Sequence, residues 1–213
     1  MESALWHPCQ ALADWATLDG LGIPRRARLV LSWAWHPRAL PHAVPNSTLA
    51  MAAQRGMDVC LLRPEGYDLE PERLAEAERL AAASGGRVSV TSDRDEALRG
   101  ARVLYAKSWG SLASWGDAAA ESARRAGLRE WCVTNEWLRA TEEARFLHCL
   151  PVRRNVVVAD EVLDGPASAV IDQAENRLHA QTALLEAILG APVSSGSAFV
   201  PAASSLASPE LSR

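Results

Sequence analysis

The chain has 213 residues, of which 48% are hydrophobic and 23% charged, which is ordinary for a globular protein with a substantial core. Its formal net charge of −4 and its pI of about 5.8 argue against general binding to nucleic acids or acidic membranes. The sequence has no apolar run near the roughly 20 residues that span a bilayer, no basic secretory segment in its first ten residues, and no C-x-x-C spacing. We therefore expect a cytoplasmic protein with no membrane or nucleic-acid partner, no metal and no cofactor.

The predicted elements begin with a helix over 7–22, in which Pro8 takes the first helical position. Short apolar runs then alternate with longer amphipathic runs, which predicts strands separated by helices. The predicted strands cover 28–34, 58–62, 87–91, 101–106 and 145–150. The predicted helices among and after them cover 45–56, 70–86, 92–100, a segment of 115–127, 134–141 and 172–190. In the helix over 45–56, Asn46 or Ser47 is the expected N-cap and Gly56 the expected C-cap.

This alternation predicts βαβ units and an α/β fold, a doubly wound parallel sheet flanked by helices, of the Rossmann-like class. In such sheets, ligands bind outside the carboxyl ends of the strands. Three loops are therefore candidates for a binding site: "WAWHPRALPHAVP" at 33–45, "KSWGS" at 107–111 and "HCLPVRRN" at 148–155. The Ala-, Ser- and Pro-rich segment 191–213 is predicted to be disordered.

His7 and Gln10 form the first candidate pair. They lie three residues apart in the first turn of the first predicted helix, so their side chains share one face. The N-terminus of that helix adds unpaired N–H groups and the positive end of the helix dipole. An imidazole and an amide in this position suit a carbonyl oxygen beside a phosphate, and simple N-terminal capping is the alternative interpretation.

The segment 148–154 is the second candidate, because it follows the last predicted strand. Pro151 bends the chain there, so that backbone carbonyls become available to a ligand amide. Arg153 and Arg154 are suited to a bidentate grip on a phosphate or carboxylate. A Cys149 nucleophile activated by His148 is the alternative, and it is disfavoured because adjacent strand residues point to opposite faces.

Four further residues lie where a ligand could reach them. Lys107, His36 and Arg38 follow predicted strands, so they are expected at the binding edge, with loop structure as the alternative. Arg177, in "ENR" at 175–177, opens the last predicted helix and lies either in the same cleft or on a solvated face.

Three motifs in this order resemble the carbamoyltransferases of arginine biosynthesis: "HPCQ" at 7–10, "HCLP" at 148–151 followed by "VRRN", and "AENR" at 174–177. The loops "WAWHPRALPHAVPNS" and "KSWG" look like those of the branch that acts on N-acetylornithine or N-succinylornithine. The resemblance covers about 1–190. It implies an interdomain linker helix within 1–27, an ornithine- or aspartate-binding α/β domain over 28–171 and a C-terminal helix over 172–190.

The same resemblance implies a first domain with a Ser-x-Arg-Thr phosphate-binding motif, which this sequence does not contain. We therefore expect a truncated chain that is inactive alone. We also expect the family's homotrimer in the full-length protein. Parts of the apolar faces of 7–18 and 172–190 are expected to be exposed, because the absent domain would cover them. A non-catalytic amino-acid-binding or assembly module is the alternative, whereas a nucleotide-binding domain is disfavoured by the lack of a G-x-G-x-x-G or Walker loop.

Residue roles also follow from the resemblance. It implies that the residues contacting carbamoyl phosphate are His7, Pro8, Cys9, Gln10, Cys149, Leu150 and Arg177. His7, Gln10 and Arg153 are the expected catalytic residues, with His7 and Gln10 polarising the carbamoyl group. The expected contacts of the N-acylated ornithine are Glu2, Lys107 and Leu150, together with His36 and Arg38 from their loop position.

The resemblance implies direct transfer of the carbamoyl group to the δ-amine of the acylornithine, without a covalent enzyme intermediate. Val157 departs from the pattern, because relatives specific for acetylornithine have a lysine there that becomes carboxylated. N-acetylornithine is the first expected substrate, and Val157 keeps N-succinylornithine open as the alternative.

Overall fold

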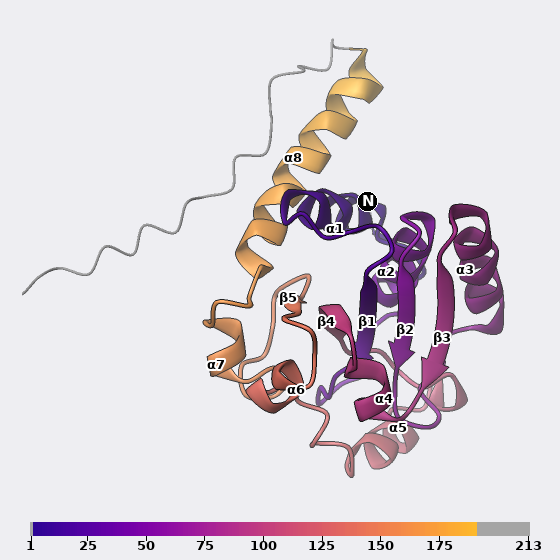
Figure 1. The fold of residues 1–213 in the computed structure, drawn as a ribbon. Helices are drawn as coiled ribbons and strands as arrows, with labels where there is room; N and C mark the ends of the chain where they lie inside the picture. The colour runs from indigo at the N-terminus through magenta and orange to yellow at the C-terminus, as the bar shows by residue number, and fades with distance from the viewer. Residues whose placement is uncertain (1, 191–213) are drawn as a thin grey trace, which may run out of the picture.

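A sheet of five parallel strands organises the structure, a computed structural model that describes residues 2–190. The strands are β1 (Arg28–Trp33), β2 (Asp58–Leu62), β3 (Arg87–Thr91), β4 (Ala101–Lys107) and β5 (Arg145–Leu147). They lie in the order β3-β2-β1-β4-β5 (Figure 1), so the chain runs from the centre of the sheet to one edge and then to the other. The doubly wound α/β fold predicted from the sequence is confirmed.

Helices cover both faces of this sheet. The helices before β3 are α1 (Pro8–Gly20), α2 (Ala43–Gln54) and α3 (Pro71–Ser84). The later ones are α4 (Arg94–Leu98), α5 (Ala118–Arg125), α6 (Asn135–Arg139), α7 (Asp160–Leu163) and α8 (Val170–Leu189), with a 3-10 turn at Leu112–Ser114. Side chains of α1, α2 and α3 share a core with one face of the sheet, and those of α4, α6 and α7 share a second core with the other.

Alternate residues along each strand contribute their side chains to one core or the other. Leu29 and Leu31 of β1 point to the side of α1–α3, whereas Val30 points to the opposite side. All three are fully buried. A strand with both faces buried reads as a continuous apolar run, which is why the parallel sheet could be predicted from short apolar segments.

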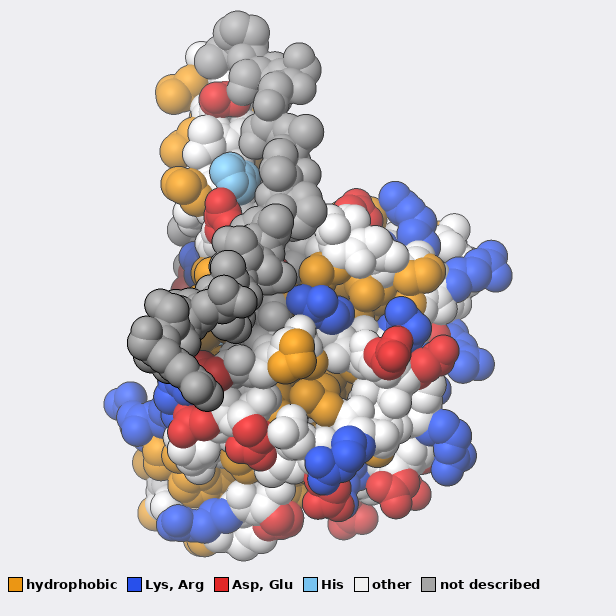
Figure 2. Space-filling view, turned by 60° about the vertical axis from the view of Figure 1, so that its left-hand side comes forward, with side chains coloured by type: hydrophobic (Ala, Val, Ile, Leu, Met, Phe, Trp, Pro, Cys, Tyr) orange, Lys and Arg blue, Asp and Glu red, His pale blue; other side chains and the backbone are white. Residues whose placement is uncertain are grey.

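The first and last helices pack on each other. Near their crossing, Asn176 Nδ2 of α8 donates to Thr17 Oγ1 of α1 over 3.0 Å. Beyond this crossing, α8 extends away from the body of the protein (Figure 1). Apolar side chains follow the projecting helix (Figure 2), and its exposed members are Leu178, Leu185, Ile188 and Leu189. Leu12 on α1 is half exposed, so the expected exposure of both apolar faces is confirmed. None of the helices within 2–190 is long and apolar enough to cross a bilayer.

Two predicted element ends were wrong in an informative way. The helix expected over 45–56 is α2, which begins at Ala43 and ends before Gly56. Asn46 and Ser47 therefore do not cap it but hold the N-terminal segment. Asn46 Nδ2 donates to the carbonyl of Leu5 over 3.2 Å, and Ser47 Oγ accepts from the backbone N–H of His7 over 2.7 Å.

The strand expected over 145–150 ends at Leu147. Leu150 has a positive φ of 45°, so it does not continue the sheet, and the peptide bond between Leu150 and Pro151 is cis. Helix α7 was not predicted, because four residues are too short for a periodic signal. The segment 191–213, predicted to be disordered, lies outside the described residues.

Candidate functional site

The candidate site lies where the strand order reverses, between β1 and β4. These neighbours pair in parallel, with Trp33 opposite Lys107 at their carboxyl ends. A cavity of about 450 Å³ opens beside these ends. Its lining residues are His36, Arg38, Leu40, Lys107, Ser108, His148, Pro151, Val152, Arg153 and Val157. The three loops selected from the sequence therefore meet at one cavity, and no carboxylate from the described part of the chain is among its lining residues.

The loop after β1 is held from the inside by Arg125, a buried residue of α5. Its guanidinium donates to the carbonyl oxygens of His36 (2.6 Å) and Arg38 (3.0 Å). It also donates to the carbonyl of Trp109, in the loop after β4, over 3.2 Å, and it pairs with the buried Glu121. One cation thus fixes the backbones of two loops, while the side chains of His36 and Arg38 line the cavity.

The two arginines of the loop after β5 separate. Arg153 lines the cavity, and its Nε lies 3.1 Å from Nε2 of His36. Arg154 was expected to grip the same anion, and this expectation was wrong. Its guanidinium instead pairs with Asp160 (2.8 Å) and Asp164 (2.7 Å), so the charge of Arg154 is compensated on the protein surface.

His148 and Cys149 do not form a nucleophilic pair. Both residues follow the end of β5, so the expected strand alternation does not apply to them. His148 Nδ1 accepts from the backbone N–H of Leu150 over 3.0 Å, and burial lowers the pKa of His148 to about 3. Burial also raises the pKa of the Cys149 thiol. A neutral, occupied imidazole beside a protonated thiol is unsuited to nucleophilic catalysis.

A second group of polar side chains surrounds His7 at the start of α1. The His7 ring is buried, and its Nε2 lies 3.6 Å from Oε2 of Glu2. Burial lowers the pKa of His7, Glu2 opposes that shift, and the charges of Arg177 and Lys107 add to it. Lys107 and Arg177 also act on the Cys149 thiol, where their positive charges oppose the effect of burial. The structure therefore brings these five predicted residues close together.

The remaining residues of "HPCQ" have different surroundings. Gln10 is buried, and its Nε2 donates to Oδ1 of Asp14 over 2.7 Å. Gln10 Oε1 and His7 Nδ1 are buried without a hydrogen-bond partner among the described residues. Cys9 is buried, whereas Pro8 lines a separate cavity of about 560 Å³ at the contact of α1 with α2. The side chain of Pro8 is therefore not brought to the cavity at the strand ends.

Lys107 connects the two groups of residues. It lines the cavity together with His36, Arg38 and Arg153, and its charge acts on His7. It is also the only lysine in the sequence, against 21 arginines. The two groups therefore lie near each other, with Lys107 common to both.

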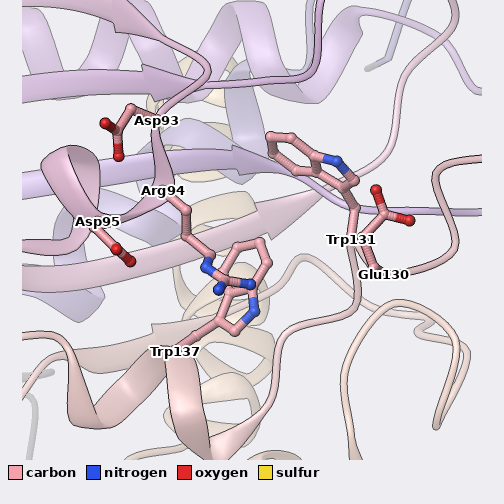
Figure 3. A pocket seen from close by; sticks show the side chains of 6 residues that line it. All are labelled: Asp93, Arg94, Asp95, Glu130, Trp131 and Trp137. Atoms are coloured by element: carbon pink, nitrogen blue, oxygen red, sulfur yellow. The ribbon is translucent and has the colours of Figure 1, made fainter.

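A different pocket lies between α4 and α6 (Figure 3). Its lining residues are Asp93, Arg94, Asp95, Glu130, Trp131 and Trp137. The Arg94 guanidinium lies 5.2 Å from the centre of the Trp137 ring and 3.8 Å from Glu136. Asp93 caps α4 by accepting from the backbone N–H of Glu96 over 3.0 Å. Because these polar groups serve the local structure and none is a predicted site residue, this pocket is not the candidate site.

The family relationship agrees with this location of the site. The family model for the Asp/Orn-binding domain of aspartate/ornithine carbamoyltransferases matches residues 41–188. The chain belongs to the aspartate/ornithine carbamoyltransferase family. The matched stretch includes the loops after β4 and β5 and nearly all of α8, so the carbamoyltransferase fold accounts for most of the cavity.

Several individual relatives are similar over the same part of the chain. An N-acetylornithine carbamoyltransferase of Xanthomonas campestris is 43% identical over 188 residues, which are 86% of this chain and 56% of that protein. An N-succinylornithine carbamoyltransferase of Bacteroides thetaiotaomicron is 36% identical over 191 residues, 89% of this chain and 55% of that protein. A crystal structure of acetylornithine transcarbamylase complexed with acetylcitrulline matches with a TM-score of 0.82 and 42% identity, over 85% of this chain and 56% of the other. The chain therefore spans little more than half the length of the carbamoyltransferases it matches.

Three residues that shape the candidate site were not selected from the sequence. Arg125 stands beside Arg124 in a predicted helical segment, and nothing in its sequence context indicates burial. Asp14 stands four residues after Gln10, a spacing that places two side chains on one helix face and could have pointed to the pair. Gln173 is 159 residues from Asp14, to which it donates a hydrogen bond of 2.6 Å, and only the folded structure connects them.

Proposed function

We propose that the chain is the amino-acid-binding half of a cytoplasmic carbamoyltransferase of arginine biosynthesis. The reaction transfers the carbamoyl group of carbamoyl phosphate to the δ-amine of N-acetyl-L-ornithine and yields N-acetylcitrulline and phosphate. The observation that carries the proposal is the cavity at the ends of β1 and β4, where Lys107, Arg38 and Arg153 converge beside His7. The full-length protein would act as a homotrimer, as the family resemblance implies.

The cavity suits an acidic amino-acid derivative. Lys107 is positioned to bind the α-carboxylate, and Arg38 lies in the same cavity wall. His36 is held by Arg153 and stays neutral near pH 7, because burial lowers the pKa of its ring. Glu2, beside His7, is suited to accept a hydrogen bond from an N–H group of the substrate. An N-acylated ornithine combines the carboxylate, amide and amine that these groups would recognise.

In the transfer step, the neutral δ-amine attacks the carbonyl carbon of carbamoyl phosphate. A C–N bond forms, the carbonyl electron pair moves to the oxygen, and the tetrahedral intermediate collapses as the C–O bond to phosphate breaks. The amine loses one proton, which the departing phosphate takes up as it leaves. His7, neutral because burial lowers its pKa, would donate an N–H to the developing oxyanion, and Arg153 and Arg177 would stabilise the negative charge.

Gln10 would bind the other end of the carbamoyl group. One N–H of its Nε2 donates to Asp14, whereas its Oε1 is buried without a hydrogen-bond partner among the described residues, so we assign the acceptor Oε1 to the ligand. An acceptor suits the –NH2 of carbamoyl phosphate and does not suit its carbonyl oxygen. In this assignment Gln10 holds the amide nitrogen, together with the backbone carbonyls of Cys149 and Leu150, whereas the family resemblance implies that it polarises the carbamoyl group.

Two acyl groups compete for the remaining space. The N-acetylornithine carbamoyltransferases among the relatives are 41–43% identical to the chain, and the N-succinylornithine ones are 36% identical, which favours the acetyl group. The cavity itself supports the succinyl group as the second candidate. Its wall combines the cations Arg38 and Arg153 with the apolar Val157, and a succinyl group would bring a second carboxylate to these cations.

Calorimetric titration of the chain with N-acetylornithine and N-succinylornithine tests the binding assignment. The native chain should bind one of them, and Lys107→Met should weaken that binding at least tenfold, since it removes a charged partner of the carboxylate. Arg79→Met, on the exposed face of α3, is the matched control and should bind like the native chain. Absence of binding to the native chain, or equal weakening in both variants, would contradict the proposal.

A turnover assay tests whether the isolated chain is catalytically active. With carbamoyl phosphate present, the 213-residue chain should bind the amino acid without forming acylcitrulline, because its sequence has no Ser-x-Arg-Thr motif for the phosphate. Turnover that disappears in His7→Ala would contradict this expectation. Binding without turnover is also the behaviour of a non-catalytic binding module, the alternative interpretation for the isolated chain.

A further inference from the structure

Asp14, which has no role in the transfer step, lies at the centre of a buried polar network. It is fully buried on α1, and its Oδ1 accepts from Gln10 Nε2 (2.7 Å) and from Gln173 Nε2 (2.6 Å). Gln173 belongs to α8, and its Nε2 also lies 3.2 Å from the hydroxyl of Tyr105 on β4. A single carboxylate oxygen thus holds amide groups from two helices.

A carboxylate fixes the direction of both amides. An ionised carboxylate only accepts hydrogen bonds, so each glutamine must present its –NH2 to Asp14. A flip of either amide would set its carbonyl oxygen against a negative oxygen. Burial raises the pKa of Asp14 to about 6, so the group is mostly ionised at pH 7 and above. The charge of Arg177 and the hydrogen bonds from Gln10 and Gln173 oppose that shift.

The oxygen atoms of the two amides have different surroundings. Gln173 Oε1 accepts from the backbone N–H of His148 over 2.9 Å and so holds the start of "HCLP". Gln10 Oε1 has no hydrogen-bond partner among the described residues, although Gln10 is only 1% exposed. One amide therefore fixes the backbone that leads to Cys149, and the other keeps an unpaired acceptor.

We infer that Asp14 is a positioning residue that sets the hydrogen-bond direction of the carbamoyl site. By holding both –NH2 groups, it leaves Gln10 Oε1 as the acceptor for the carbamoyl –NH2 and Gln173 Oε1 as the acceptor for the backbone N–H of His148. The inference rests on the proposed function, since that function supplies the carbamoyl ligand. Asp14 itself contacts only protein groups and takes no part in bond making.

The test compares two ligands that differ in the group that would hydrogen-bond to Gln10 Oε1. Phosphonoacetamide carries an amide –NH2 and a phosphonate, like carbamoyl phosphate, whereas methyl phosphonoacetate has an ester oxygen in place of the –NH2. The native chain should bind phosphonoacetamide at least tenfold more tightly, because a site built around an acceptor rejects the ligand that lacks the donor.

Asp14→Asn should reduce this preference to threefold or less. An asparagine amide both donates and accepts, so Gln10 would no longer be confined to one orientation. Thr17→Val is the matched control, because it removes the hydrogen bond between Asn176 and Thr17 in the same helix contact without touching Gln10. It should keep the native preference. A tenfold preference that survives in Asp14→Asn would overturn the inference.

The side-chain amide signals of Gln10 and Gln173 in ¹⁵N-labelled protein give a second, ligand-free measurement. Both signals should shift in Asp14→Asn and stay in place in Thr17→Val, and unchanged signals in Asp14→Asn would also overturn the inference. If these shifts appear but the native chain binds neither phosphonate, the carbamoyl site of the proposed function fails, while the control of the two amides by Asp14 stands.

Discussion

Arg153 Nε lies 3.1 Å from Nε2 of His36, and this contact joins the loop after β5 to the loop after β1. The two residues are 117 positions apart in the sequence. Since an Arg side chain only donates, His36 Nε2 must be the acceptor, and its ring is therefore neutral with the proton on Nδ1. Nδ1 lies 2.9 Å from the carbonyl of Arg38, which completes the chain of contacts. Nδ1 also lies 3.1 Å from the backbone N of Arg38, so the His36 ring is held between Arg153 and the backbone of its own loop.

Acid should destabilise the protein through His148. Burial lowers its pKa from 6.5 to about 3, so the unfolded chain binds more protons than the folded one between these values. Stability therefore falls as the pH drops below 6.5, by up to about 5 kcal/mol at pH 3 for this group. His148→Asn, which keeps an acceptor for the Leu150 N–H, should remove that part of the pH dependence in urea unfolding.

His179→Asn, on the exposed part of α8, is the matched control for this experiment. Its stability should follow that of the native chain across the same pH range. If the unfolding free energies of the native chain and of His148→Asn change with pH in parallel, His148 is not buried in its neutral form.

Asp14 should act in the opposite direction. Its pKa is raised from 3.8 to about 6, so the folded state binds more protons than the unfolded state between these values. Its contribution is therefore fully present below pH 3.8 and is lost as the pH rises through 6. The unfolding free energy of the native chain should fall relative to Asp14→Asn by about 3 kcal/mol between pH 4 and pH 7. A constant difference across this range would show that the Asp14 carboxyl is not buried as described.

Removal of Arg125 should be strongly destabilising. The side chain is buried, pairs with Glu121 and holds three backbone carbonyls, so Arg125→Met leaves a buried carboxylate uncompensated. The expected loss is roughly 3–5 kcal/mol in denaturant unfolding. Arg124→Met, one residue earlier and exposed, should cost much less. The double variant Arg125→Met with Glu121→Met should recover part of the loss. Equal stability of Arg125→Met and Arg124→Met would refute a structural role for the buried pair.

Thiol chemistry should distinguish Cys132 from Cys149. Cys132 is partly exposed, whereas Cys149 is buried, and burial raises the pKa of both thiols. N-ethylmaleimide should therefore modify the folded chain slowly at Cys132, faster as the pH rises, and leave Cys149 intact. Peptide mapping by mass spectrometry checks the positions, and Cys132→Ser should resist modification. Rapid modification of Cys149 would restore the nucleophile hypothesis.

The sequence was sufficient to predict the architecture and the loops that form the cavity, because both depend on local patterns. Short apolar runs marked the strands, and the rule that ligands bind at carboxyl ends selected Lys107, His36 and Arg153. Errors arose where long-range contacts override local preference. Ser47 looked like a helix cap because it is a good one, but in the fold its hydroxyl accepts from His7 instead.

The ion pairs and hydrogen bonds within the site could not be predicted for the same reason. Arg153 and Arg154 are adjacent and chemically identical, and only the position of Asp160 and Asp164 separates their roles. Likewise, Gln173 and Asp14 have no sequence feature that pairs them. A hydrogen bond across 159 residues leaves no periodic signal in a single sequence.

The projection of α8 has a consequence for the helix itself. Up to about Arg177 it is anchored to α1 and to the start of "HCLP", but beyond that point it has few tertiary partners among the described residues. A helical segment of about 12 residues is marginal in water without packing. Its final turns, near the C-cap Gly190, should therefore fray in the isolated chain. The helical population should decline along α8 from its N-terminal half to its C-terminal end. A partner surface that covers Leu185 and Ile188 would stabilise these C-terminal turns as an ordered helix.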